Sequence, residues 1–260
     1  MTAILQTVGL TKTFGAVTAA SQITLDVEAG SIVGLIGGNG AGKTTFINLV
    51  TGYLEPTAGV VRFLGREVTG LSSRRLTRMG LCRSFQIPQV FDSLSARENL
   101  LVGLGIVALG KRAFAASSTL EGRTPEEVAD EMLPRFRLEP WRDAPASTLP
   151  EGVRKLLDIA MALVVKPRLL LLDEPTSGIS AEEKFELMDL VLGAIRAENV
   201  TVLFVEHDME IVRRYTHRVI AFYEGKTIAD GAPEKVLDDP GVRRYVVGEP
   251  IAPAGKEGQC

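Results

Sequence analysis

The stretch Gly37-Gly38-Asn39-Gly40-Ala41-Gly42-Lys43-Thr44-Thr45 decides the fold. It follows an apolar run, 32–36, that is typical of a buried strand, and it precedes 46–50, which is typical of the first turns of a helix. A strand, a glycine-rich turn and a helix are the context that a phosphate-binding loop requires. Glycines let the backbone approach phosphate oxygens closely. The amides of the loop and of the helix N-terminus then point at the anion.

Two side chains in this stretch add chemistry. Lys43 supplies a positive charge for the β- and γ-phosphates, and the Thr44 hydroxyl is a potential ligand of Mg²⁺. The alternative is a strand-to-helix turn that is glycine-rich for structural reasons alone, since a bare match to this pattern occurs by chance. The correct flanks on both sides favour nucleotide binding.

The composition is that of an ordinary globular protein of 260 residues, with 45% hydrophobic residues and a net charge of −3. This charge gives no basic field that would favour nucleic acid as a partner. Cys82 and Cys260 are far apart, so we expect two reduced thiols. No secretory signal pattern opens the chain, and the longest apolar run, 100–110, is too short for a bilayer. A role at a membrane would therefore need a partner protein.

Acidic and imidazole side chains follow two further strand patterns. Asp173 and Glu174 come directly after four leucines, 169–172, and His207 comes just after the apolar run 200–205. Such continuous runs are typical of central parallel strands, whose carboxyl ends share one edge of the sheet. An aspartate there can hold Mg²⁺ through water, and a glutamate can polarise an attacking water. Solvated loop carboxylates and a structural histidine are the alternatives, and the strand-end positions argue against them.

Two more residues stand at suggestive positions. Phe14 precedes Gly15 in a predicted turn between N-terminal strands, where it can either stack on an adenine ring or join the core. Gln86 ends a predicted strand that starts at Leu81, and its carboxamide oxygen can reach a metal ion or a water at the γ-phosphate.

The middle of the chain, 94–166, is predicted to be mostly helical. Three capping-box patterns are expected to open helices, at Thr124 to Glu127, at Thr148 to Glu151 and at Ser180 to Glu183. The small and polar stretch 111–124 is predicted to be a surface loop.

Taken together, the ordered motifs resemble the ATP-binding subunits of ABC transporters. Within that family the segments 31–37 and 84–88 resemble the branched-chain amino acid uptake group. The resemblance covers 5–248 and implies an α/β fold. That fold is a P-loop NTPase (RecA-like) core with an antiparallel β subdomain and an α-helical subdomain at about 88–166. Residues 249–260 are expected to form a flexible tail.

The resemblance also implies a role for each motif residue. It makes Phe14 the adenine-stacking aromatic, Gln86 the Q-loop glutamine, Glu174 the catalytic carboxylate and His207 the switch histidine. The implied cofactors are ATP and Mg²⁺, the latter held by Thr44, Gln86 and Asp173. The implied ATP-binding loop is Gly37, Gly38, Asn39, Gly40, Ala41, Gly42, Lys43, Thr44 and Thr45.

One motif departs from the family pattern. The signature stretch, which contacts the partner subunit's ATP in this family, is usually Leu-Ser-Gly-Gly-Gln, and here it is Leu149-Pro150-Glu151-Gly152-Val153. Proline offers neither a hydroxyl nor a backbone N–H, and glutamate brings negative charge towards a phosphate. Arg154 and Lys155 are expected to offset part of that charge. Two hypotheses stay open: pairing with a different ATPase subunit that carries an intact signature, or a homodimer that tolerates the change.

The resemblance implies an ATP-hydrolysing, energy-coupling subunit of an importer, for branched-chain amino acids or a related small polar or carboxylate solute. The implied partners are integral membrane permease subunits, a second ABC ATPase subunit and, indirectly, a periplasmic or extracellular solute-binding protein. The implied location is peripheral, on the cytoplasmic face of the inner (plasma) membrane. A soluble ABC ATPase not coupled to transport and an exporter ATPase are the alternatives.

Overall fold

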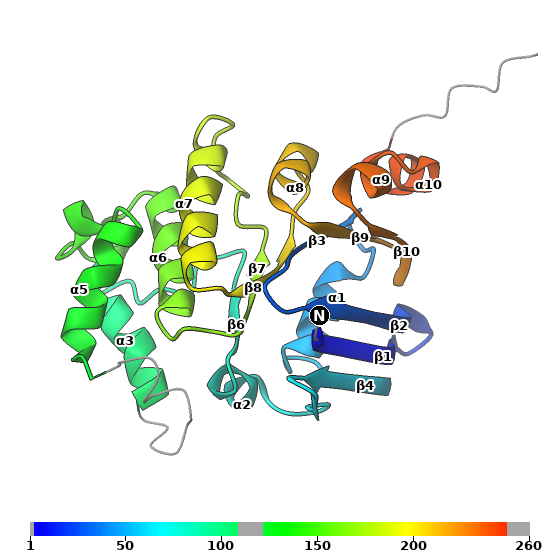
Figure 1. Cartoon of the computed structure of the whole chain (residues 1–260), viewed down its shortest axis with the longest axis horizontal. Coiled ribbons are helices and arrows are strands. Elements are labelled where there is room, and N and C mark those ends of the chain that lie inside the picture. Colours follow the sequence, from blue (N-terminus) through cyan, green and yellow to red (C-terminus); the bar gives the residue numbers. More distant parts are fainter. Residues whose placement is uncertain (1–2, 109–121, 249–260) are drawn as a thin grey trace, which may run out of the picture.

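A central six-stranded sheet forms the core of the protein (Figure 1). The structure is a computed structural model and describes residues 3–108 and 122–248. The strand order is β10-β9-β3-β8-β7-β6. All neighbours are parallel except β10, which pairs antiparallel with β9. The strands are β3 (Ile32–Gly37), β6 (Leu81–Ser84), β7 (Leu169–Asp173), β8 (Thr201–Val205), β9 (Arg218–Tyr223) and β10 (Lys226–Gly231).

The four leucines of β7 show why this sheet is the core. Leu170 and Leu172 belong to the hydrophobic cluster on one face, and Leu169 and Leu171 belong to the cluster on the other. All four are fully buried, as the alternating side-chain directions of a strand covered on both faces require. The prediction of a central parallel strand at this position is therefore confirmed.

A second, four-stranded sheet has the order β2-β1-β4-β5 and is antiparallel. Its strands are β1 (Ala3–Phe14), β2 (Val17–Glu28), β4 (Ala58–Phe63) and β5 (Arg66–Glu67). It shares one hydrophobic cluster with helix α1 (Lys43–Val50) and with one face of the central sheet. The antiparallel strands predicted for the N-terminal segment are confirmed.

Helices cover the rest of the core. In Figure 1, α3 (Ala96–Ala108), α5 (Pro125–Arg135), α6 (Glu151–Leu163) and α7 (Glu183–Ala197) gather on the side away from β1 and β2. The remaining helices of the described residues are α2 (Ser73–Arg78), α8 (Met209–Tyr215), α9 (Pro233–Leu237) and α10 (Pro240–Val242). The short 3₁₀ and π turns are Glu139–Trp141, Ala146–Thr148 and Arg243–Val247. The division into subdomains at about 88–166 remains a prediction.

The capping predictions have mixed outcomes. The box at Thr124 is complete, because its hydroxyl accepts from Glu127 N and the Glu127 carboxylate accepts from Thr124 N. The box at Thr148 is wrong: α6 begins at Glu151, and the Thr148 hydroxyl donates to the Pro145 carbonyl. Proline disfavours helical geometry in the residue before it, and that residue is indeed extended.

The box at Ser180 is half formed. The Ser180 hydroxyl accepts from Glu183 N and donates to the Glu183 carboxylate, but the regular helix α7 begins only at Glu183. Most of the loop predicted at 111–124 and the tail at 249–260 lie outside the described residues. Across 3–108 and 122–248, no helix is both long and apolar enough to cross a membrane.

Candidate functional site

The glycine-rich loop joins β3 to α1, as expected. Gly42 caps α1 with a φ of +101°, and a Cβ there would lie 2.6 Å from the Ala19 carbonyl oxygen. A Cβ on Gly37 would lie 2.7 Å from the Phe222 carbonyl oxygen. These two positions therefore exclude any side chain, whereas a Cβ on Gly40 would meet nothing within 4 Å. The loop is therefore packed against neighbouring backbone at Gly37 and Gly42 and open at Gly40, an arrangement that suits the binding of an anion by backbone amides.

Lys43 reaches back over this loop. Its ammonium donates to the carbonyls of Gly37 (2.6 Å) and Gly38 (3.1 Å), and the residue is only 6% exposed. Burial lowers the pKa of Lys43, while the carboxylates of Glu174 and Asp173 act in the opposite direction. The structure thus places this ammonium within electrostatic reach of both predicted acidic residues.

The acidic and imidazole residues meet at one edge of the central sheet. Nε2 of His207 lies 2.9 Å from Oε1 of Glu174, and Nε2 of Gln86 donates to Oε2 of Glu174 at 2.8 Å. These side chains follow β7, β8 and β6, which run parallel, so their carboxyl ends share an edge with the loop after β3. A cavity of about 340 Å³ opens beside this cluster and is lined by Glu174, His207, Ser177 and Lys184, among others.

The backbone of Glu174 is unusual. Its φ is +50°, a region that residues other than glycine rarely adopt, and its N–H donates to the Val205 carbonyl at 3.0 Å. Strain of this kind persists only where the surrounding structure holds it, and it concentrates at functional sites. The bond to β8 therefore fixes the direction in which the Glu174 side chain leaves β7.

Asp173 has a partner that the sequence analysis did not predict. Nη2 of Arg83 lies 2.6 Å from Oδ2 of Asp173, and Nη1 of Arg83 donates to Oδ1 of Asn48 at 2.6 Å. Asp173 itself is 8% exposed. A charged residue in the middle of the otherwise neutral strand Leu81–Ser84 is the sequence signal that could have revealed this contact.

The residues expected to hold Mg²⁺ offer oxygen atoms only: the hydroxyl of Thr44, the carboxylate of Asp173 and the carboxamide oxygen of Gln86. Within the described part of the chain, no group of three or more His, Cys, Asp or Glu residues could hold a metal ion. Magnesium in nucleotide sites is bound through one or two carboxylates together with phosphate oxygens and water. This donor set fits that kind of site.

Phe14 lies at the tip of the β1–β2 hairpin, paired with Val17, and is 51% exposed. Lys12 places its ammonium 5.2 Å from the ring centroid. Ala19, two residues beyond Val17, contacts the phosphate loop through its carbonyl. Phe14 is therefore a solvent-exposed aromatic near the loop and does not belong to the core.

The altered signature forms the start of α6. Pro150 is the N-cap, and Glu151 and Gly152 are the first two helical residues. The Glu151 carboxylate lies beside Gly178, since a Cβ on that glycine would be 2.6 Å from Oε1 of Glu151. Lys155 is buried, and its ammonium contacts the Ser177 carbonyl.

Arg154 and Lys155, the two basic residues that follow the signature stretch, have different partners. Burial lowers the pKa of Lys155, and the carboxylate of Glu151 acts in the opposite direction. Arg154 instead binds Asp92 at 2.6 Å and the Ala146 carbonyl at 3.1 Å. Lys155 thus offsets part of the charge of Glu151 as expected, whereas Arg154 is engaged elsewhere.

Two buried acids hold the loops of the site and were missed by the sequence analysis. Asp158 on α6 accepts from the Ser84 hydroxyl (2.6 Å), Gln89 N (2.9 Å) and Phe85 N (3.3 Å). Burial raises its pKa, and these hydrogen bonds act against that shift.

Glu206 accepts from Thr176 N (3.0 Å), the Thr176 hydroxyl (2.6 Å) and His207 N (3.1 Å). It therefore ties the segments after β7 and β8 together. The sequence signal that could have revealed these loop-holding residues is an acidic residue on the apolar face of a predicted helix, as with Asp158, or at the end of a buried strand, as with Glu206.

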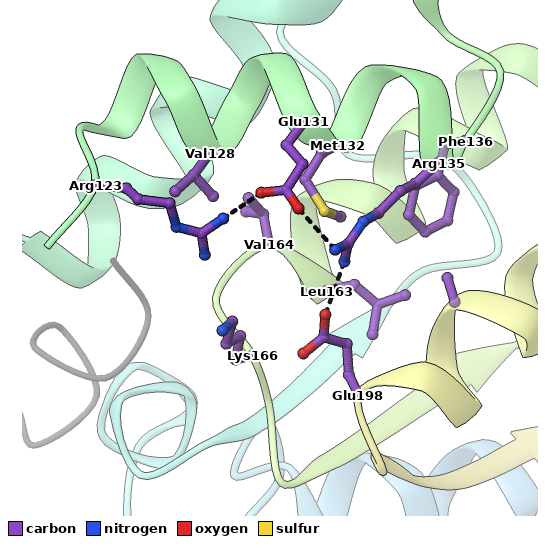
Figure 2. A pocket seen from close by; sticks show the side chains of 11 residues that line it. Arg123, Val128, Glu131, Met132, Arg135, Phe136, Leu163, Val164, Lys166 and Glu198 are labelled. Carbon is purple, nitrogen blue, oxygen red and sulfur yellow. Dashed lines mark hydrogen bonds and ion pairs between the residues drawn. The ribbon is translucent and has the colours of Figure 1, made fainter. Parts of the chain in front are cut away.

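A separate cavity of about 220 Å³ lies between α5 and the C-terminal ends of α6 and α7. Figure 2 shows that its charged side chains face one another: Glu131 pairs with Arg123 and Arg135, and Arg135 pairs with Glu198. Its lining shares no residue with the cluster around Glu174. These ion pairs join the helices, and we assign the cavity no role in the site.

The parallel sheet and the loop at its edge define a P-loop nucleotide-binding protein. The family model described as ABC transporter matches residues 20–177. The high-affinity branched-chain amino acid transport ATP-binding protein BraF of Pseudomonas aeruginosa is 36% identical over 250 residues, which cover 95% of this chain and 98% of that protein. The corresponding LivG protein of Salmonella typhimurium is 35% identical over 252 residues, covering 93% and 96%.

A solved ATP-binding cassette of an ABC transporter, in its ADP conformation, superposes with a TM-score of 0.82 at 30% identity, covering 96% of this chain and all of that one. The chain belongs to the ABC transporter family, as an ATP-binding cassette. Cassettes of this family bind nucleotide and hydrolyse ATP to power transport. The resemblance inferred from the motifs and the fold class it implied are confirmed.

Proposed function

We propose that this chain powers an importer for branched-chain amino acids or a related small polar or carboxylate solute. It would act as a peripheral subunit on the cytoplasmic face of the membrane, beside permease subunits and an external solute-binding protein. Similarity to BraF and LivG, which are named for branched-chain amino acid transport, supports this solute class over export and over a soluble role.

One observation carries the assignment of the site. Lys43, Glu174 and His207 come from three different strand ends, yet they gather at one sheet edge. Positioning and electrostatic stabilisation dominate phosphoryl transfer, so a fixed ammonium and a fixed carboxylate on the two sides of a phosphate are what the reaction requires.

Within this site Glu174 acts on the water. Its carboxylate takes a proton as the water attacks the γ-phosphorus, and the bond to the β–γ bridging oxygen breaks, giving ADP and phosphate. His207 Nε2 and Gln86 Nε2 hold the two carboxylate oxygens, each of which retains a further lone pair for that proton. Phe14 offers its exposed ring to the adenine, and the loop amides receive the phosphates.

Thr44, Gln86 and Asp173 would hold Mg²⁺. When bound, this ion neutralises charge on the β- and γ-phosphates. In this proposal Thr44 contributes its hydroxyl oxygen, Asp173 its carboxylate and Gln86 its carboxamide oxygen.

Solute uptake tests this proposal. A strain that lacks the gene should lose accumulation of radiolabelled leucine, isoleucine and valine. The wild-type chain should restore it, and a Glu174→Gln chain expressed at the same level should not. Normal uptake of all three amino acids in the deletion strain would exclude this solute class.

The segment after Gln86 is the proposed permease contact. Ile87 is 74% exposed, and Phe91 is also exposed, an unusual placement for two large apolar side chains so near an active site. Asp158 holds the backbone between them in place.

Ile87→Glu should therefore abolish co-purification with the permease subunits, because a charge would be buried at the contact, and should leave the ATPase activity of the isolated chain within about twofold of wild type. Ile228→Glu on β10 is the matched control, since Ile228 is exposed but lies on another face of the fold. Equal permease recovery for both variants would contradict this placement.

We further propose pairing with a second, different ATPase subunit. Pro150 presents neither a hydroxyl nor a backbone N–H to a facing phosphate, and the negatively charged Glu151 carboxylate is fixed beside Gly178. The isolated chain should consequently turn over slowly, because both of its sites would face this altered signature.

The double substitution Pro150→Ser and Glu151→Gly should raise steady-state phosphate release by the isolated chain about tenfold. It adds one charge-assisted contact to the facing phosphate and removes the repulsion between that phosphate and the Glu151 carboxylate. Adding the partner ATPase to the wild-type chain should give a similar rise. Full turnover by the wild-type homodimer would favour the homodimer hypothesis instead.

A further inference from the structure

The buried guanidinium of Arg83 is a group that the proposed reaction leaves without a role. It lies on β6, in register with Leu171 of β7, and Asp173 is two residues further along β7. Side chains two residues apart on a strand share a face, so Arg83 and Asp173 point towards α1 as a diagonal pair. The two charged side chains are 8% and 9% exposed, and their closest atoms are 2.6 Å apart.

Four contacts hold the guanidinium of Arg83. One arm of its guanidinium binds Asp173 and the other binds Asn48, on the same helix as Thr44 and four residues later. Its Cζ atom also lies 4.7 Å from the ring centroid of Phe85 and 5.7 Å from that of Tyr53, two rings that pack edge to face. The two hydrogen bonds join the guanidinium to β7 and α1, and the two rings, which lie in loops, cover it.

This position has an electrostatic consequence at the proposed Mg²⁺ site. Arg83 binds Oδ2 of Asp173, and the same carboxylate is a predicted ligand of the metal. A divalent cation held by that carboxylate would lie within a few ångströms of a fixed positive charge in a poorly solvated place, where like charges repel strongly. The same positive charge neutralises Asp173, and so it lowers the repulsion between that carboxylate and a polyphosphate that arrives without metal.

We propose that Arg83 is a resident counter-ion of Asp173. It orients the carboxylate, strengthens binding of metal-free nucleotide and limits how much affinity Mg²⁺ adds. Arg83 acts only through Asp173, so it is a positioning residue and takes no part in the proton transfer. This inference rests on the nucleotide site proposed above.

The test measures binding of N-methylanthraniloyl-ATP by fluorescence, once in EDTA and once in excess Mg²⁺, in a Glu174→Gln background that slows hydrolysis. The ratio of the two dissociation constants is the affinity gained from the metal. Arg83→Gln and Arg83→Met remove the charge, and methionine also preserves contact with the two aromatic rings if glutamine prevents folding. Both should bind more weakly in EDTA, and both should increase the ratio on the order of tenfold.

Two controls separate charge from packing. Arg83→Lys keeps the charge and should keep the ratio within about twofold of the parent. Arg62→Gln removes an exposed arginine on β4 and should do the same. A purely structural role for Arg83 would lower the melting temperature and weaken binding equally in both buffers, leaving the ratio unchanged. That result, or a lysine variant that behaves like the neutral ones, would overturn the inference. Failure of the parent to bind nucleotide in either buffer would instead overturn the proposed function.

Discussion

Glu174→Gln should lower ATP turnover by about 10²–10⁴-fold, because the carboxamide cannot take the proton of the attacking water. ATP affinity should remain, since glutamine has the same shape and its oxygen can still accept from His207, which lies 2.9 Å from Oε1 of Glu174. Phosphate release and equilibrium ATP binding are the two measurements. We also expect the variant to remain as an ATP-loaded dimer on size-exclusion chromatography.

Glu234→Gln is the control for this substitution. Glu234 is an exposed residue of α9, remote from the strand ends, so its turnover should equal that of the wild type. Unchanged hydrolysis in Glu174→Gln would show that another group activates the water, and the proposed role of Glu174 would be wrong.

Lys43→Met should weaken ATP binding by about tenfold to a hundredfold, the size expected for one lost charge-assisted contact to phosphate. The thermal midpoint in the absence of nucleotide should change by only a few degrees. Burial lowers the pKa of Lys43, so the folded protein bears a cost for its charge, and methionine removes that cost along with two hydrogen bonds. Isothermal titration calorimetry and thermal unfolding measure the two quantities.

Lys235→Met, at an exposed position of α9, provides the matched control and should leave both quantities unchanged. Equal ATP affinity in Lys43→Met and Lys235→Met would remove Lys43 from the site. A large loss of stability with Lys43→Met would indicate that its bonds to the loop carbonyls are mainly structural.

The central sheet was predictable because its strands are short, apolar and bounded by clear signals. The leucines before Asp173 and the apolar run before Glu206 both became buried parallel strands. The failed prediction at Thr148 shows a limit of local patterns. Its spacing to Glu151 fits a capping box, but Pro150 imposes an extended conformation on Leu149 and moves the helix start by two residues.

Glu174, directly after β7, and His207, two residues after β8, were predictable as site candidates, because each stands at the end of a recognisable strand and carries a group that the reaction can use. Arg83, Asp158 and Glu206 were not, because each acts through a partner that is remote in sequence. Arg83 and Asp173 are 90 positions apart, and Asp158 and Ser84 are 74 apart. Only the pairing of β6 with β7 and the packing of α6 bring these groups together.

The three hydrogen bonds of Asp158 have a mechanical consequence. The Asp158 carboxylate on α6 accepts hydrogen bonds from residues before and after the turn that carries Gln86 and Ile87. A force applied to the exposed Ile87 would be transmitted through these hydrogen bonds to α6, including Glu151 in its first turn. The same turn would also pull on the carboxamide that touches Glu174. With the proposed permease contact at Ile87, a movement of the permease would thus reach both the Glu174 site of this chain and the signature at the start of α6.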